Sequence, residues 1–316
     1  MSFIRTVLGD VPPQALGACY AHEHLIIEKS YATQLFPDIH LPSVDNAVRE
    51  LNDFKTAGGG AMIDCMPCDS GRNVEKLAEI SRKSGVHLVA PTGLHRLRFY
   101  PEGHWRYTWP ADRLADLFVD EIERGIDAND GAGPELRRTP YRAGILKIAS
   151  DGAVLDDAER VAFEAAASAH RRTGCPVITH CEAARGIEQV SFLGSRGVEP
   201  RHLTLSHTDR HPDRAYHREL LKTGVSVEYD RVFRAALDED NPTLRLFVEM
   251  VKEHPSQVML GTDGARASYW RSYGGKPGLD YLLREFSDRA KKLGVTEAEL
   301  KAVFVDNPAR AYAFRR

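Results

Sequence analysis

The sequence lacks a long hydrophobic run. No stretch approaches the roughly 18–20 consecutive apolar residues that a membrane-spanning helix needs. The opening residues, MSFIRTVLGDVPP, also lack the apolar core of a secretory signal peptide. We therefore expect a protein that has no membrane partner and that works in the cytoplasm.

An excess of positive charge is also missing. The chain has 42 lysine and arginine residues against 45 aspartate and glutamate residues, which gives a formal net charge of −3. A protein dedicated to nucleic acid needs a basic excess to neutralise phosphates, so we expect no nucleic-acid partner. The hydrophobic fraction of 42% is ordinary for a globular protein and is sufficient for a large core.

Cysteine is scarce, with five residues in a chain of 316. An odd number in a long chain without an export signal favours reduced thiols over a disulfide framework. Cys65 and Cys68 form a C-x-x-C motif, but no second pair follows at the spacing of a zinc ribbon. We interpret them as two thiols at the end of a strand rather than as a redox or metal site.

Short apolar runs alternate with longer amphipathic segments along the chain. Eight runs are nearly continuous in apolar or small residues, as is typical of parallel strands that are covered on both faces. They are Cys19–Ile27, Ala61–Met66, His87–His95, Ala143–Ser150, Cys175–Glu182, His202–Asp209, Gly224–Arg231 and Gln257–Gly264. Eight strand–helix units predict an α/β fold, a closed (β/α)8 TIM barrel that forms a single domain over residues 1–316.

Helix boundary signals stand between these runs. Ser43 is a predicted N-cap, Pro110 marks a first turn, and Gly85 and Gly174 are predicted C-caps. The predicted helices are Ser43–Ala57, Asn73–Ser84, Pro110–Ala128, Asp156–Thr173, Arg185–Arg196, Asp213–Thr223, Pro242–Glu253, Gly278–Leu293 and Thr296–Phe304. The longest insertion, at about residues 96–142, follows the third predicted strand.

Polar residues at the ends of the apolar runs are the site candidates, because the active site of a TIM barrel lies at the carboxyl ends of its strands. In chain order they are His22, His24, Asp64, His95, Lys147, His180, His207, Glu228, Asp230, Arg231 and Asp263. His22 and His24 are two positions apart, so on a strand they point to the same face. Neutral imidazoles together with the carboxylate of Asp263 suit a divalent cation.

Lys147 lies within an apolar run, where a cation is costly to bury unless it is paired. Carboxylation by carbon dioxide would turn it into an anion able to bridge two metals, whereas pairing with Asp64 or Asp151 is the alternative. Similarly, a lone histidine at a strand end is often a hydrogen-bonded core residue, and Asp263 alone would serve as a helix cap. The ordered set across eight strands favours metal ligands over these separate explanations.

The sequence resembles the phosphotriesterase family of the amidohydrolase superfamily over essentially its whole length. The stretches that carry the similarity include CYAHEHL, GILKIAS, VITHCE, LTLSHTD, VEYDRV and VMLGTDGAR. The resemblance implies a metal-dependent hydrolase of the phosphotriesterase-like lactonase branch. It also implies two divalent metal ions, usually zinc, with manganese or cobalt able to substitute.

The ligand set implied by the resemblance has six members, namely His22, His24, Lys147, His180, His207 and Asp263. The first two histidines and the aspartate would hold the more buried metal, and the other two histidines would hold the more exposed one. The lysine, as N6-carboxylysine, would bridge the two ions. Asp263 would also act in catalysis by accepting the proton of the attacking water, and Asp64 would orient a ligand histidine.

The loops after the third, seventh and eighth strands are cationic and rich in hydroxyl groups. They supply the predicted substrate-binding residues His95, Tyr100, Arg231, Arg266, Tyr269, Arg271 and Tyr273, and also Arg234. Arginine suits phosphate oxygens, and barrel phosphate sites commonly use the loops after strands seven and eight. The motif SYGGKPGL is similar to family members that act on five-carbon sugar lactone phosphates. We therefore predict a small-molecule substrate, a sugar 1,4-lactone 5-phosphate.

Two other functions remain open. An organophosphate triesterase or acyl-homoserine lactone hydrolase shares the chemistry but needs hydrophobic subsites, and a non-catalytic binding protein conflicts with the filled ligand positions. The arginines would alternatively form a solvated rim or subunit contacts. The resemblance suggests a homodimer. Trp105, Tyr107 and Trp109 would supply its interface or else pack the insertion over the barrel rim.

Overall fold

A closed barrel of parallel strands forms the centre of the molecule. The computed structural model describes residues 2–131, 135–151, 155–182, 184–236, 238 and 240–314. Its barrel strands are β3 (Ala18–Glu23), β4 (Gly59–Asp64), β5 (His87–Val89), β6 (Pro91–Gly93), β7 (Ile145–Ala149), β8 (Val177–His180), β9 (Leu203–Ser206), β10 (Ser226–Tyr229) and β11 (Val258–Leu260). β5 and β6 are two parts of the predicted third strand, so the eight predicted strands and the TIM barrel are confirmed.

The strands pair in parallel and in chain order, and the last strand closes onto the first. β3, β4 and β5 form one ladder and β6 to β11 form the other. Between β3 and β11, the backbone amides of Thr262 and Asp263 donate to the carbonyl of His22 over 3.3 and 3.2 Å. The approach is close enough that a Cβ at Gly261 would lie 2.8 Å from the Cβ of His22. This seam places the eighth strand end directly beside the first.

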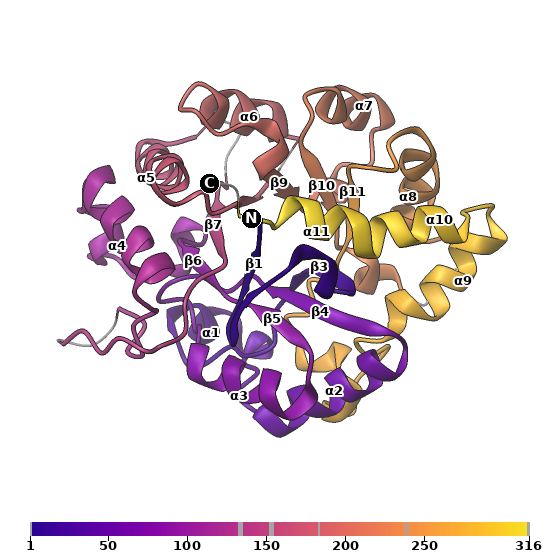
Figure 1. The fold of residues 1–316 in the computed structure, drawn as a ribbon, viewed down its shortest axis with the longest axis horizontal. Coiled ribbons are helices and arrows are strands. Elements are labelled where there is room, and N and C mark those ends of the chain that lie inside the picture. Colours follow the sequence, from indigo (N-terminus) through magenta and orange to yellow (C-terminus); the bar gives the residue numbers. More distant parts are fainter. Residues whose placement is uncertain are drawn as a thin grey trace.

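Helices surround the strands on the outside (Figure 1). The main ones are α2 (Val44–Thr56), α3 (Val74–Ser84), α4 (Ala111–Glu123), α5 (Asp157–Thr173), α6 (Gly186–Gly194), α7 (Arg214–Lys222), α8 (Pro242–Glu253) and α9 (Glu285–Lys292). The side chain of Ser43 caps α2 by accepting from the amide of Asn46. Gly85 and Gly174 end α3 and α5 with left-handed φ angles of 69° and 72°. These caps confirm the predicted boundaries.

Two predicted helices near the carboxyl terminus have different limits. α9 begins at Glu285 instead of Gly278, because Gly278 has a φ of +95° and Arg284 has a non-helical backbone, which confine residues 281–283 to a single 3-10 turn. α10 (Glu297–Lys301) begins with the capping box of Thr296. It then continues past the predicted end at Phe304, through a wide π-helical turn at Ala302–Asp306, into α11 (Asn307–Ala311).

The sequence patterns did not predict the short elements. The hairpin of β1 (Ile4–Thr6) and β2 (Gly9–Val11) covers the amino ends of the barrel strands, and Phe3 pairs with Phe314 beside it. The two chain ends therefore lie side by side (Figure 1). A short helix, α1 (Tyr31–Leu35), follows β3. The remaining 3-10 turns are Pro13–Ala15, Pro37–Ile39, Leu97–Phe99, Trp105–Tyr107, Pro200–His202, Thr208–Arg210, Val232–Ala235, Ala267–Tyr269 and Arg271–Tyr273.

The insertion after the third strand packs over the barrel rim. The rings of Trp105 and Trp109 lie 4.6 Å apart, and Arg106 is buried and donates to the carbonyl of His95 over 2.6 Å. Tyr107 is 42% exposed. The two tryptophans therefore have packing partners within the chain, and a subunit interface there stays a prediction.

The core has two layers, one inside the barrel and one between the strands and the helices. Cys65 belongs to the inner layer, with Ile63, Ile145 and Ile178. Cys68 belongs to the outer layer, and its thiol donates to Glu121 over 3.3 Å. All five cysteines are buried free thiols, as expected from the sequence.

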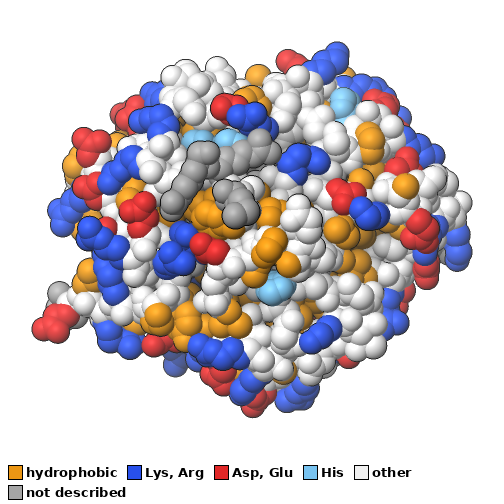
Figure 2. Space-filling model, viewed as in Figure 1, with side chains coloured by type: hydrophobic (Ala, Val, Ile, Leu, Met, Phe, Trp, Pro, Cys, Tyr) orange, Lys and Arg blue, Asp and Glu red, His pale blue; other side chains and the backbone are white. Residues whose placement is uncertain are grey.

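Charged side chains of both signs alternate around the edge of the face in Figure 2, with no large block of one sign. This face lies at the amino ends of the barrel strands, where the β1–β2 hairpin sits. None of the helices in the described part of the chain is both long and apolar enough to cross a bilayer.

Candidate metal centre

The polar side chains at the strand ends converge on one cavity of about 140 Å³ at the carboxyl side of the barrel. Five of the six predicted ligands line it, namely His22, His24, His180, His207 and Asp263. The sixth, Lys147, is 1% exposed within β7 and belongs to the wall behind them. The barrel thus gathers side chains from β3, β8 and the ends of β9 and β11 at one place.

His22, His24 and Asp263 form the first compact group. Their ligand atoms all lie within 4.8 Å of one another, and Nε2 of His24 is 3.4 Å from Oδ1 of Asp263. Nδ1 of His24 is buried and has no hydrogen-bond partner among the described residues. A buried imidazole nitrogen without a partner is costly unless it binds something. The group therefore fits a divalent cation.

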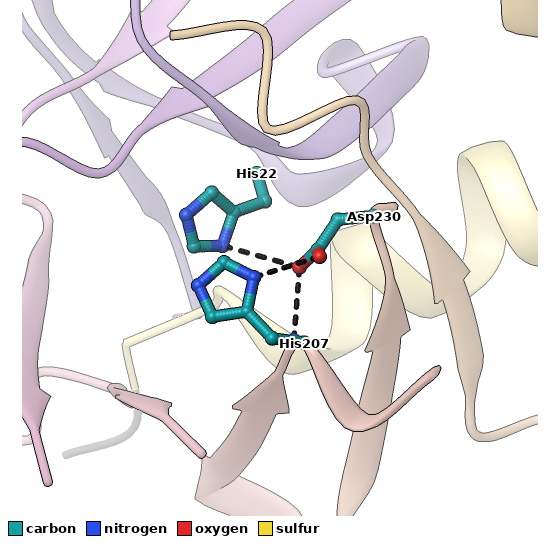
Figure 3. Close-up of side chains that lie close together, drawn as sticks. All are labelled: His22, His207 and Asp230. Carbon is teal, nitrogen blue, oxygen red and sulfur yellow. Dashed lines mark hydrogen bonds and ion pairs between the residues drawn. The ribbon is translucent and has the colours of Figure 1, made fainter. Parts of the chain in front are cut away.

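His207 and His22 share a second carboxylate, Asp230, at the end of β10 (Figure 3). Nδ1 of His207 donates to Asp230 over 2.7 Å, and the backbone amide of His207 donates to the same carboxylate over 3.0 Å. Nδ1 of His22 lies 3.6 Å from Asp230. Because a carboxylate holds Nδ1 of His207, its Nε2 is the nitrogen left for a metal.

His180 stands against His207, with ring centroids 4.2 Å apart. Its Nε2 donates to Oε1 of Glu182 over 2.9 Å. The engaged nitrogen of His180 is therefore Nε2, the opposite of the arrangement in His207, and Nδ1 is left as the metal-binding atom. His95 adds a fifth imidazole ring to the cavity, 5.8 Å from that of His180, and stacks on Phe99.

Lys147 and Glu228 form the floor below these rings. Nζ of Lys147 donates to the hydroxyl of Ser206 over 3.3 Å, and Glu228 is fully buried. Glu228 accepts from Nδ1 of His22 over 3.0 Å and from the hydroxyl of Tyr312. The alternative partners considered for Lys147 have other contacts: Asp151 pairs with Arg96, and Asp64 accepts from the backbone amides of Leu25 and Met66.

Burial sets the protonation of the cavity. It lowers the pKa of His22, His95, His180 and His207 well below the ordinary value, and nearby cationic groups add to the effect for the first three. These imidazoles are therefore neutral at pH 7, which is the form that binds metals.

Two carboxylates of the cavity have opposite shifts. Burial raises the pKa of Asp230 to about 7. Burial also opposes ionisation of Asp263, but His24, His207 and Arg234 outweigh it and hold the pKa of Asp263 well below its usual range. Asp263 is thus an anion at neutral pH.

Two ligand candidates have a strained backbone. His207 and Asp263 have φ angles of +59° and +46°, in the left-handed region that costs a non-glycine residue roughly 1–3 kcal/mol. The strain is held in place by the bond from the amide of His207 to Asp230 and by that from the amide of Asp263 to His22. Both left-handed positions turn a side chain into the cavity.

Five arginines line the same cavity: Arg96, Arg98, Arg210, Arg234 and Arg266. Arg234 donates to Oδ2 of Asp263 over 2.9 Å, and Arg266 pairs with Asp38. The apolar part of the lining consists of Phe36, Ile39, Met66, Phe99 and Ala265. A small polar cavity with this cationic wall suits a small anionic molecule.

The structure brings three of the predicted substrate-binding residues, His95, Arg234 and Arg266, into the cavity lining. The other five, which lie outside the lining, are Tyr100, Arg231, Tyr269, Arg271 and Tyr273. Arg271 pairs with Asp280, 2.6 Å away. The hydroxyl of Tyr100 accepts from the amide of His95 over 2.8 Å and donates to the carbonyl of Cys68.

The residue expected to orient a histidine also acts differently. Asp64 accepts from the backbone amides of Leu25 and Met66, over 2.9 and 3.0 Å, instead of from an imidazole. The carboxylates that orient the histidine rings are instead Asp230, Glu228 and Glu182. The first two are recognisable in sequence as polar residues at the end of a strand.

Sequence reasoning overlooked Glu182 and Arg210. A usable signal for Glu182 was its spacing of two from His180, which places both side chains on one face of an extended segment. Arg210 follows His207 by three residues, in a 3-10 turn that no strand or helix pattern indicates.

Comparisons with known proteins agree with this geometry. Residues 2–312 match the phosphotriesterase family. A phospho-furanose lactonase of Mycoplasmopsis agalactiae is 32% identical, with 99% of this chain and 92% of that protein covered. The crystal structure of an amidohydrolase from Mycoplasma synoviae superposes with a TM-score of 0.96 at 30% identity, over 100% of this chain and 93% of the other. A lactonase from Listeria monocytogenes gives a TM-score of 0.90 at 28% identity, over 99% and 100%.

Proposed function

This chain belongs to the phosphotriesterase family of hydrolytic enzymes, and from that premise we propose that it is a binuclear metal-dependent lactonase that opens phosphorylated sugar lactones. The observation that carries the proposal is the coincidence of two features in one cavity. The metal-ligand candidates and five arginines line the same space of about 140 Å³. Drug-sized ligand pockets measure roughly 300–1,000 Å³, so this cavity suits a small and anionic substrate.

The chain's own residues would hold two divalent ions, with zinc the first choice for a donor set of imidazoles and carboxylates. His22, His24 and Asp263 would hold one ion, and His180 and His207 would hold the other. Lys147, carboxylated on Nζ, would join both. The bound ions would supply Lewis acidity, which lowers the pKa of water and polarises the lactone carbonyl.

Asp263 is the residue that moves the proton. Its lowered pKa keeps it ionised, and Arg234 holds Oδ2 so that the carboxylate keeps one orientation. The water oxygen bonds to the lactone carbonyl carbon while Asp263 takes one proton. The ring C–O bond then breaks, and Asp263 passes that proton to the leaving ring oxygen. The product hydroxy acid loses its carboxylic proton to solvent.

The arginines would bind the phosphate group of the substrate. Arg266 and Arg234 stand on the side of Asp263, and Arg96, Arg98 and Arg210 stand on the side of His95 and His180. Guanidinium groups bind phosphate oxygens through two parallel hydrogen bonds. A neutral organophosphate or a long acyl chain would gain little from such a wall.

A lactone panel with metal analysis tests the proposal. We expect the metal-replete enzyme to open a pentonate 1,4-lactone 5-phosphate far faster than the same lactone without phosphate. Elemental analysis should find about two equivalents of divalent metal per chain.

Three outcomes would argue against this function. Equal rates on the two lactones would remove the phosphate from the proposal. A rate that rises steeply with acyl chain length would favour an acyl-homoserine lactone hydrolase. A protein that binds less than about one equivalent of metal would be a binding protein rather than an enzyme.

A further inference from the structure

We propose that Glu182 is a positioning residue that couples the metal centre to the cationic wall of the cavity. One of its oxygens, Oε1, contacts three groups at once: it accepts from Nε2 of His180 and from Nη1 of Arg210, and it forms an ion pair with Nη1 of Arg96. The first group belongs to a candidate metal ligand, and the other two belong to the wall that faces the substrate. Neither the family match nor the metal-ligand pattern assigns a role to this glutamate.

The bond to His180 sets which nitrogen faces the metal. Glu182 follows β8, two residues after His180, and the 2.9 Å contact engages Nε2. His180 must therefore carry its proton on Nε2, and Nδ1 keeps its lone pair for a cation.

The bonds to the arginines hold two cations in place. Arg96 contacts Glu182 over 2.9 Å and also pairs with Asp151, and Arg210 pairs with Glu182. Nε of Arg210 is buried and has no partner among the described residues, so its guanidinium depends on Glu182 for its direction. Removing the carboxylate would leave Arg210 free to turn away from the cavity.

The charge of Glu182 matters as well as its shape. Arg96 and Arg210 are mostly buried, with side chains 11% and 22% exposed, and their mutual repulsion is offset at Oε1. An amide in place of the carboxylate would still accept one hydrogen bond but would not balance two guanidinium groups. The pair would then move apart, and both the metal site and the anion site would be affected.

This inference rests on the proposed function, since it assumes metal at His180 and an anionic substrate near Arg96 and Arg210. Glu182→Gln, Glu182→Asp and wild type are loaded with cobalt and compared by visible absorption, by metal competition with a chelator and by lactone kinetics. The matched control is Glu164→Gln, which removes a glutamate that pairs with Arg196 on the surface at α5.

We expect Glu182→Gln to weaken the binding of one of two cobalt ions by about 10- to 100-fold and to alter its absorption band. Saturating cobalt should restore most of kcat, but KM for the phosphorylated lactone should stay several-fold higher, with KM for the unphosphorylated lactone unchanged. Glu182→Asp, which keeps the charge, should lie between Glu182→Gln and wild type. Glu164→Gln should match wild type.

Failure of the proposed function and failure of the positioning role of Glu182 give different results. If wild type binds no cobalt or opens no lactone, the proposed function fails. If wild type behaves as proposed but Glu182→Gln keeps the cobalt affinity, the spectrum and both KM values of wild type, the positioning role is wrong. A variant with a lower unfolding temperature and an unchanged KM ratio between the two lactones would show a purely structural role.

Discussion

Three of the four candidate ligand histidines have a carboxylate partner for the ring nitrogen that faces away from the candidate metal centre. Asp230 serves His207, Glu228 serves His22, and Glu182 serves His180. A partner of this kind fixes the tautomer and the rotation of the ring before any cation arrives. The centre is thus prearranged by residues that do not themselves bind the metal in the proposed function.

Asp230→Asn tests this arrangement at His207. The amide still accepts one hydrogen bond, but it lacks the charge that holds Nδ1 and the backbone amide of His207 together. Zinc affinity, measured by competition with a chelator, should fall about 10- to 100-fold while the far-ultraviolet circular dichroism stays constant. Asp116→Asn, which removes an exposed partner of Arg172, serves as the control. Equal zinc affinity in Asp230→Asn and wild type would contradict the prediction.

Arg266→Ala separates substrate binding from metal binding. The residue lines the cavity and pairs with Asp38. We expect unchanged metal content and a KM for the phosphorylated lactone that is roughly tenfold higher, the effect of losing one charged hydrogen bond. Arg271→Ala is the matched control, because that guanidinium lies outside the lining. If Arg266→Ala affects the two lactones alike, Arg266 does not bind phosphate.

At the scale of elements, the seam between β3 and β11 decides whether the first and eighth strand ends meet. Glu23 reaches across it and accepts from the backbone amide of Thr262 over 2.8 Å. Gly261 has no room for a side chain there, since an added Cβ would lie 2.7 Å from the amide nitrogen of His22. The candidate metal ligands His22 and Asp263 therefore depend on a close backbone approach between two strands.

Gly261→Ala should force these strands apart. We expect a lower unfolding temperature and a lower metal content, because His22 and Asp263 no longer converge; the destabilisation should reach about 1–3 kcal/mol, as for an overpacked core. Gly194→Ala, at a helical position where an added Cβ meets nothing within 4 Å, should leave stability unchanged or slightly higher. Full metal content in Gly261→Ala would show that the seam tolerates a Cβ.

Much of this architecture was predictable from the sequence, because parallel strands and their caps depend on local patterns. The strand runs and the caps at Ser43, Gly85 and Gly174 are properties of a few neighbouring residues. Five of the six candidate ligands were found because they lie close to the ends of apolar runs, and Lys147 was found because it is a charged residue inside one. The cavity lining was less predictable, since Arg210 and Arg271 look alike in sequence and only the tertiary fold turns one of them inward.

For the molecule as a whole, buried carboxyl groups make the stability of the metal-free protein depend on pH. Burial raises the pKa of Glu23, Glu228 and Asp130 to about 8, against ordinary values of 4.5, 4.5 and 3.8. Between pH 7 and 8 these groups are ionised in the unfolded chain and at least half protonated in the folded one. The folded state binds more protons, so the free energy of unfolding must fall as the pH rises.

Urea unfolding in the presence of a chelator measures this effect. We expect the free energy of unfolding to decrease from pH 7 to pH 8, by at most about 1.4 kcal/mol per pH unit for each group. The buried histidines oppose the trend near pH 6.5, because they are neutral in the folded protein while the unfolded imidazoles, with an ordinary pKa of about 6.5, are still partly protonated. Their contribution fades above pH 7, where the carboxyl groups dominate. Bound zinc should flatten the decline by stabilising the ionised carboxylates near it. A stability that rises across this interval would contradict the prediction.

The contact between Phe3 and Phe314 has a practical consequence for rearranging the gene. Their rings stack 4.8 Å apart next to the amino ends of the barrel strands, across the barrel from the candidate metal centre. A short peptide would bridge the two ends, so a circularly permuted chain opened in a surface loop would keep every cavity residue in register. Fused reporters attached at either end would likewise leave the substrate entrance unobstructed.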